Sequence, residues 1–178
     1  GDRAVDFLML RPAIAAGLAC ALLMSAPSAR PLRLDDAGRV SAQVLQLVNK
    51  ARRHSRHCGA ERYPAVGPVR LSSALSRAAH AHASDMAIHD FFEHTGSDGS
   101  TPTKRLARTG YRWRLTGENI AYGPTSAEEV VSGWLASPGH CENIMEPRFT
   151  EMGISYAFGS TRGEPVYWVQ ELAVPRAP

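Results

Sequence analysis

The chain has 178 residues, 44% of them hydrophobic and 21% charged, which is ordinary usage for a globular protein with one core and excludes general disorder. Its formal net charge of +3 comes from scattered arginines, with a mild cluster at positions 52, 53, 56 and 62. This charge is too sparse for a nucleic-acid surface, and no phosphate-binding loop or dinucleotide fingerprint occurs. We therefore expect no nucleic-acid partner.

Residues 1–29 differ in composition from the rest of the chain and form an N-terminal extension and signal peptide. A basic Arg11 precedes an apolar run from Ala13 to Met24, and small residues follow, as in secretory signals. The run is too short to span a bilayer comfortably. We predict cleavage between Ala26 and Arg30, an exported periplasmic or extracellular protein, and no transmembrane segment in the mature chain. A lipoprotein anchored at Cys20 is the weaker alternative, because the preceding residues fit a lipobox poorly.

Residues 30–40, rich in proline, glycine and charge, are predicted to be a linker, and residues 41–175 to be one domain. From Ser41 the apolar residues Val44, Leu47, Val48 and Ala51 recur at spacings of three and four, which predicts a helix. The following "HCGAERYPAVGPVR" is predicted to be loop, because glycines and prolines interrupt it.

A second helix is predicted from about Ser73 to Asp90, with Ser72 or Ser73 as its cap, and a short one from Pro102 to Thr109. The segment "GENIAYG", Gly117 to Gly123, is predicted to be a loop. Ser126 and Glu129 then form a capping box for a third helix that ends near Ser137, and Pro138 suits the first turn of another. "TEMGISYA" and "PVYWVQELAV" read as an antiparallel hairpin. Helices followed by a hairpin predict an α+β domain.

Removal of the signal peptide leaves two cysteines, Cys58 and Cys141. An even pair in an exported protein predicts one disulfide. That bond closes a loop of roughly eighty residues, which the chain-entropy model values at about 4 kcal/mol.

Three ionisable residues stand in polar or glycine-bearing contexts: His94 in "FFEHTG", Glu118 in "GENIAYG" and His140 in "SPGHCENIM". Taken alone, His94 is better explained as a capping or surface residue, and His140 reads equally simply as a loop residue. A carboxylate in an apolar segment, such as Glu118, requires a histidine, arginine or metal partner. Histidine clusters at residues 54–58 and 80–82 lack zinc-site spacing. A nucleophilic Cys141 or Ser137 is less favoured than a disulfide and a helix cap.

Four motifs, in order, carry a resemblance to a known family: "HAHASDMAIHDFFEHTGSDGSTP", "TGENIAYG", "VVSGWLASPGHCENIMEPRFTEMGISYA" and "YWVQEL". Over about residues 42–173 the chain resembles the bacterial branch of the CAP superfamily, which includes cysteine-rich secretory proteins, venom antigens and plant pathogenesis-related proteins. The resemblance implies a three-layer α-β-α sandwich with a central antiparallel sheet.

The resemblance also implies an open cleft with two histidines and two acidic residues, which binds divalent metal in some relatives. His94, Glu118 and His140 match three of these positions, and Ser137 replaces the second acidic residue. Two imidazoles and one carboxylate are a ligand set that can hold Zn²⁺, with Mg²⁺ as the other candidate. Glu118 is expected to raise the pKa values of both histidines. As cleft support we expect the set Asn119, Ser137, Asn143 and Gln170.

These implications favour a binding protein, without established catalysis, for a small ligand, a metal ion, a lipid or another cell-envelope component. Two alternatives stay open. The first is a metal-assisted hydrolase of the peptidase kind, with Glu118 as general base, against which the missing acidic residue argues. The second is a structural secreted module whose polar cleft is vestigial.

Overall fold

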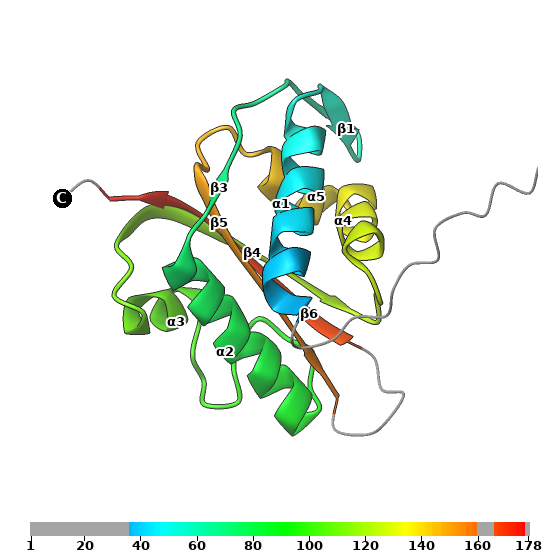
Figure 1. The fold of residues 1–178 in the computed structure, drawn as a ribbon. Coiled ribbons are helices and arrows are strands. Elements are labelled where there is room, and N and C mark those ends of the chain that lie inside the picture. The colour runs from blue at the N-terminus through cyan, green and yellow to red at the C-terminus, as the bar shows by residue number, and fades with distance from the viewer. Residues whose placement is uncertain (1–35, 160–165, 177–178) are drawn as a thin grey trace, which may run out of the picture.

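The structure, a computed structural model, describes residues 36–159 and 166–176 (Figure 1). The predicted signal peptide and the turn of the C-terminal hairpin lie outside these residues. The elements, in chain order, are α1 (Ala37–Arg52), β1 (Arg56–Cys58), β2 (Glu61–Tyr63), β3 (Arg70–Leu71), α2 (Ser73–His89), α3 (Pro102–Arg108), β4 (Trp113–Tyr122), α4 (Ala127–Ala136), α5 (Pro138–Met145), β5 (Glu151–Phe158) and β6 (Val166–Pro175). None of the helices in this described part is long and apolar enough to cross a membrane.

The main sheet has the strand order β3-β5-β6-β4, which places β4 at one edge. β6 pairs antiparallel with both β4 and β5, whereas the two-residue β3 runs parallel to β5. The central sheet is therefore antiparallel, as expected, with one short parallel strand at the far edge. β1 and β2 form a separate antiparallel hairpin.

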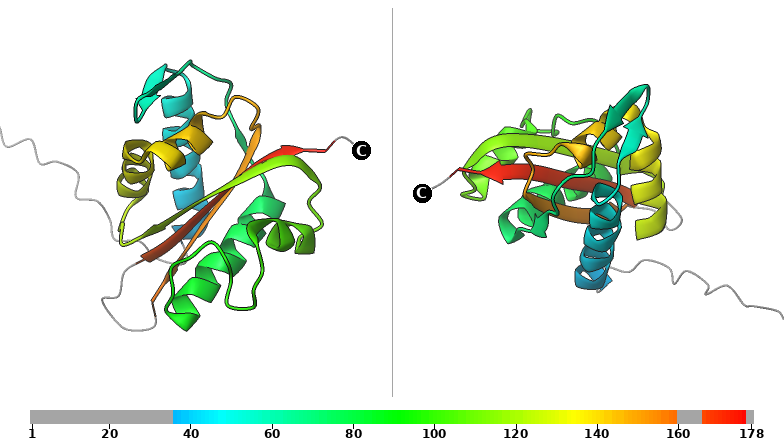
Figure 2. Two further views of the ribbon diagram at one scale, coloured as in Figure 1. Left: turned by 180° about the vertical axis from the view of Figure 1, so that it is seen from behind. Right: turned by 90° about the horizontal axis from the view of Figure 1, so that it is seen from above.

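Helices cover both faces of this sheet and make three layers (Figure 2). Trp168 and Leu172 of β6 belong to a core with α1, α4 and α5, whereas Tyr167 and Val169 belong to a core with α2. Leu106 of α3 packs with α2 residues and Ala173 on that second face. Since side chains alternate along a strand, β6 places apolar residues on both faces, interrupted by the buried polar pair Gln170 and Glu171.

The predicted helices are present. α2, α3 and α4 agree with their predicted ranges within a residue, and α5 begins at Pro138. Ser126 caps α4 by accepting a hydrogen bond from the Glu129 amide at 3.2 Å. α1 begins at Ala37 instead of Ser41, because Val40 is also buried and extends the apolar stripe by one turn into the predicted linker.

Two loop predictions are wrong. "GENIAYG" lies largely within strand β4, and the segment after α1 contains β1, β2 and β3. In β4 the residues Gly117, Glu118 and Asn119 have low strand propensity. Pairing with β6 along the whole strand overrides it. The other three strands have two or three residues each, too few to show a periodic pattern.

The predicted disulfide between Cys58 and Cys141 is present, with a Cα–Cα distance of 5.4 Å. Both residues are buried. The bond joins the β1–β2 hairpin to α5, the helix that carries His140.

Candidate functional site

The candidate site is built around the carboxylate of Glu118, whose side chain is only 2% exposed. Its Oε1 lies 2.7 Å from His94 Nδ1, and its Oε2 lies 2.6 Å from a terminal nitrogen of Arg105. An ionised carboxylate only accepts, so Nδ1 of His94 carries the proton in this contact. The His94 side chain is 54% exposed, and its ring is held by a buried anion while the residue remains open to solvent.

The segment that carries His94 is fixed to its surroundings by buried hydrogen bonds. α2 ends at His89, and the next residue, Asp90, is in the left-handed conformation. Nε2 of the fully buried His82 lies 2.9 Å from the carbonyl oxygen of Glu93. Arg105 donates to the carbonyl oxygens of His94 at 3.0 Å and Ser100 at 2.8 Å. Arg105 therefore neutralises Glu118 and also holds the loop that presents His94.

A second buried acid lies beside Glu118 on the neighbouring strand. Glu171 of β6 is its cross-strand partner and is fully buried. Neither Glu171 oxygen receives a hydrogen bond from a described donor. Burial, followed by the charge of Glu118, raises the pKa of Glu171 well above its ordinary value. Glu171 is consequently held as a neutral acid whose hydroxyl can donate to Glu118.

The pKa of Glu118 itself is lowered. Burial alone raises this pKa, but the hydrogen bond from His94 and the charge of Arg105 outweigh it. Glu118 is therefore an anion at neutral pH, with its charge balanced by the groups that contact both of its carboxylate oxygens.

The side chain of Asn119 lies on the opposite face of β4 from that of Glu118. Its amide nitrogen donates to the His140 carbonyl oxygen at 3.2 Å and to Gln170 Oε1 at 2.9 Å, and its oxygen accepts from Asn143 at 2.9 Å. Asn143 also donates to the Glu118 carbonyl oxygen at 3.3 Å. These contacts place the start of α5, and with it His140, against the edge strand.

Side chains pack closely against Gly117, so a larger residue there would have to displace them. A Cβ on Gly117 would lie 3.0 Å from Asn143 Oδ1 and 3.1 Å from Phe149 Cζ.

Ser137 is the N-cap residue of α5, yet its side chain makes no capping hydrogen bond. We call the set His94, Arg105, Glu118 and His140 the β4-edge site.

The two histidines respond differently to their surroundings. The hydrogen bond with Glu118 raises the pKa of His94 above 6.5. The pKa of His140 is instead lowered, first by burial and then by the charge of His94. The expectation that both values rise is therefore wrong for His140, which gains no carboxylate partner. The charge of His94 therefore contributes to the low pKa of His140.

As a three-ligand metal set, the predicted residues do not fit. No group of three or more His, Cys, Asp and Glu among the described residues is arranged to hold a metal ion. Both Glu118 oxygens are occupied by His94 and Arg105. What does fit is a pair of imidazoles with Glu118 orienting one of them, since metal-binding histidines commonly donate their second ring N–H to a carboxylate.

Sequence reasoning missed Arg105 and Glu171. Nothing local distinguishes Arg105 from Lys104 and Arg108 on the same short helix. Glu171 did carry a signal, because a charged residue inside the otherwise apolar end of β6 must be neutralised or paired.

Comparison with known proteins identifies the family. The family model for CAP, the cysteine-rich secretory protein family, matches residues 45–172, and the chain belongs to this family. Protein YkwD of Bacillus subtilis strain 168, uncharacterized by its own description, is 36% identical over 114 residues, which are 64% of this chain and 41% of that protein. The chain thus spans less than half of that relative.

Solved structures agree on the fold. An extracellular protein containing an SCP domain from Bacillus anthracis superposes with a TM-score of 0.64 and 25% identity, over 82% of this chain and 45% of that chain. An outer surface protein from Borrelia burgdorferi superposes with a TM-score of 0.63 and 18% identity, over 83% of this chain and 98% of that chain. The predicted family and α-β-α sandwich are confirmed.

Proposed function

We propose that this chain is an exported CAP-domain protein that binds a small ligand or cell-envelope component at the β4-edge site, with His94 and His140 as the contact groups. One observation carries the proposal: His94 is half exposed while its Nδ1 is fixed 2.7 Å from a buried, ionised Glu118. A ring anchored in this way is preorganised to present its other nitrogen outward, which lowers the entropy cost of binding. The extracellular Bacillus anthracis protein of the same fold supports export.

A divalent metal is the simplest ligand for this arrangement. Neutral imidazoles are good ligands for Zn²⁺, and the lowered pKa of His140 keeps its imidazole neutral at physiological pH. In this proposal His94 and His140 hold the ion and Glu118 orients His94 without touching the metal. When bound, the ion supplies a positive charge that attracts anionic or carbonyl groups of a ligand.

The hydrolase alternative receives less support from Glu118. A general base must reach the proton that it removes, whereas both Glu118 oxygens already accept charged hydrogen bonds and the side chain is 2% exposed. Its lowered pKa also makes it a weak base. We therefore favour binding over catalysis.

Calorimetric titration of the purified full chain with Zn²⁺ at neutral pH tests the proposal. His94→Gln and His140→Gln should each abolish measurable binding, and Glu118→Gln should weaken it by about 10–100-fold, as expected for an orienting partner. His89→Gln is the matched control, because His89 is also 54% exposed and its Nδ1 lies 2.9 Å from Asp85. Unchanged binding in both His94 and His140 variants would contradict a metal site there and favour the structural-module alternative.

Export is tested separately by intact-mass measurement of protein recovered outside the cytoplasm. An N-terminus between Pro27 and Pro31 is expected from the small-residue cleavage signal. Retention of Gly1 in that protein would contradict cleavage.

A further inference from the structure

A cationic surface lies at the end of the sheet where β6 ends and β4 begins, formed by different residues from the β4-edge site. Between Asp98 and Glu118 the chain has five basic residues and no acidic one, namely Lys104, Arg105, Arg108, Arg112 and Arg114. Arg105 forms an ion pair with Glu118, and Arg108 forms one with Asp98 at 2.8 Å. The remaining three are exposed, and none of them forms an ion pair with a described residue.

The fold brings one more free cation to this place. The Arg176 amide, directly after β6, donates to the Arg112 carbonyl oxygen at 2.9 Å. Arg176 is exposed and likewise has no ion-pair partner among the described residues. A register shift between Trp113 and Leu115 falls at Arg114. We call Arg112, Arg114 and Arg176, with Tyr111 and Trp113, the Arg112 surface.

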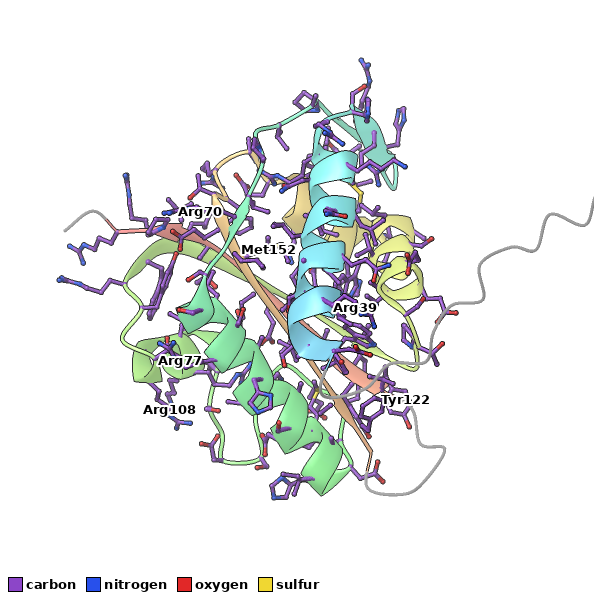
Figure 3. All side chains as sticks on the ribbon, in the orientation of Figure 1. Arg39, Arg70, Arg77, Arg108, Tyr122 and Met152 are labelled. Atoms are coloured by element: carbon purple, nitrogen blue, oxygen red, sulfur yellow. A yellow bond between two sulfur atoms is a disulfide. The ribbon has the colours of Figure 1, made fainter. Side chains whose placement is uncertain are left out.

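More arginines flank this surface. Arg70, Arg77 and Arg108 lie along the same side of the molecule, the side on which β6 ends (Figures 1 and 3). Arg77 donates to the Thr109 carbonyl oxygen at 3.3 Å, and Arg70 pairs with Glu151, the acid that also accepts from the Tyr111 hydroxyl at 2.8 Å. The charge of this end is therefore predominantly positive.

Aromatic rings and a shallow cavity occur among these cations. The cavity has a volume of about 420 Å³ and is lined by Ala107, Gly110, Tyr111, Arg112, Trp113 and Arg176, none of which is acidic. Trp113 and Tyr111 are half buried, whereas Trp134 and Trp168 are 1% and 0% exposed. Exposed arginines beside half-exposed tryptophan and tyrosine are the combination that peripheral proteins use at a lipid headgroup layer.

We propose that the Arg112 surface docks this protein on an anionic phospholipid surface, with the guanidinium groups on headgroup phosphates and the Trp113 ring at the headgroup level. The three arginines come from two segments, residues 112–114 and residue 176, and all are exposed, so their charge is spread over a surface and is not focused on one buried point. Attraction to such a surface is worth about fivefold in affinity for each arginine, and screening by salt weakens it.

The test measures binding of the full chain to vesicles of phosphatidylcholine alone and of phosphatidylcholine mixed with phosphatidylglycerol, by co-sedimentation. We expect binding to the mixed vesicles only, weakened by added salt. Arg112→Gln/Arg114→Gln/Arg176→Gln should weaken it by about a hundredfold, from fivefold for each charge. The control, Arg39→Gln/Arg53→Gln/Arg62→Gln, removes the same net charge from α1, the residue after it and β2, outside the Arg112 surface, and should change binding by less than about fivefold.

Tryptophan emission locates the contact. The chain has three tryptophans, and two are buried, so a blue shift on vesicle binding reports Trp113. Trp113→Phe should remove the shift. Equal losses in the two triple variants, or binding without the shift, would overturn the proposal. The same shift produced by inorganic phosphate without vesicle binding would also overturn it, in favour of a soluble anion.

Discussion

Removal of Arg105 should destabilise this fold strongly, because one buried side chain carries an ion pair and two hydrogen bonds to main chain. Its guanidinium is 4% exposed and donates to Glu118 Oε2 at 2.6 Å, to the His94 carbonyl oxygen at 3.0 Å and to the Ser100 carbonyl oxygen at 2.8 Å. Arg105→Met keeps an unbranched apolar stem in the same space while removing all of these hydrogen bonds. Glu118 then retains only His94 as a positively charged contact.

The expected loss of unfolding free energy is about 3–5 kcal/mol, the usual cost of removing one partner of a buried ion pair. That is a fifth or more of the total stability of a typical domain, which is about 5–15 kcal/mol. The loss should shrink in acid. The pKa of Glu118 in the folded state lies below its ordinary value of 4.5. The ionised carboxylate therefore stabilises the fold at pH values above its pKa in the unfolded chain, and this stabilisation disappears as the pH falls through its pKa in the folded protein.

Urea unfolding at pH 7, followed by tryptophan fluorescence, measures this loss. Arg108→Met is the matched control on the same helix, because its ion pair with Asp98 is exposed and should contribute little. A loss below about 1 kcal/mol for Arg105→Met, within the range of surface pairs, would refute the reasoning. An equal loss in the two variants would refute it as well.

Three further outcomes are expected. Replacing Cys58 and Cys141 together by serine should lower the unfolding free energy by about 4 kcal/mol on the chain-entropy model, measured by thermal unfolding; an unchanged Tm would contradict this. Gly153→Ala should cost about 3 kcal/mol or more, because its Cβ would lie 2.2 Å from main chain of α2, whereas Gly133→Ala has open space and should not destabilise in the same urea assay. In an NMR titration the pKa of His94 should exceed 6.5. The protonated ring then stabilises the fold fully below pH 6.5, and this stabilisation is lost as the pH rises through the pKa of His94 in the folded protein. A measured pKa at or below 6.5 would refute this.

The sequence was sufficient to predict those elements that depend only on residues a few positions apart. Helix periodicity and capping predicted α2, α3 and α4, because an apolar stripe and a Ser126 cap depend only on residues within a few positions. Alternating and continuous apolar runs predicted β5 and β6, and two cysteines predicted their own disulfide. The four family motifs predicted the fold as a whole, and the family match confirms it.

Prediction from the sequence was wrong or incomplete where residues far away in the sequence form the surroundings of a side chain. The "GENIAYG" segment was predicted to be loop because its glycine and polar residues do not look like a buried strand. Glu118 is tolerated in β4 because Arg105, thirteen residues earlier, neutralises it. Glu171 tolerates burial by staying protonated beside that anion. Neither compensation is visible from the strand's own sequence.

Strand geometry explains why Glu118 and Asn119 are adjacent. Successive side chains of a strand point to opposite faces, so Glu118 binds His94 and Arg105 on the α2 and α3 side, while Asn119 binds the His140 main chain and Gln170 on the α5 side. One dipeptide at a sheet edge thereby positions both histidines from opposite layers.

The integrity of the β4-edge site consequently depends on the register between β4 and β6. Glu118 pairs with Glu171 and Asn119 pairs with Gln170. A slip of one residue would send each side chain to the wrong face, placing the carboxylate under α5 and away from Arg105. The buried Asn119–Gln170 hydrogen bond of 2.9 Å and the close approach of Asn143 to Gly117 both exist only in the observed register. The polar residues that look least like a strand are thus the ones that fix its alignment and, through it, the spacing of the two histidines.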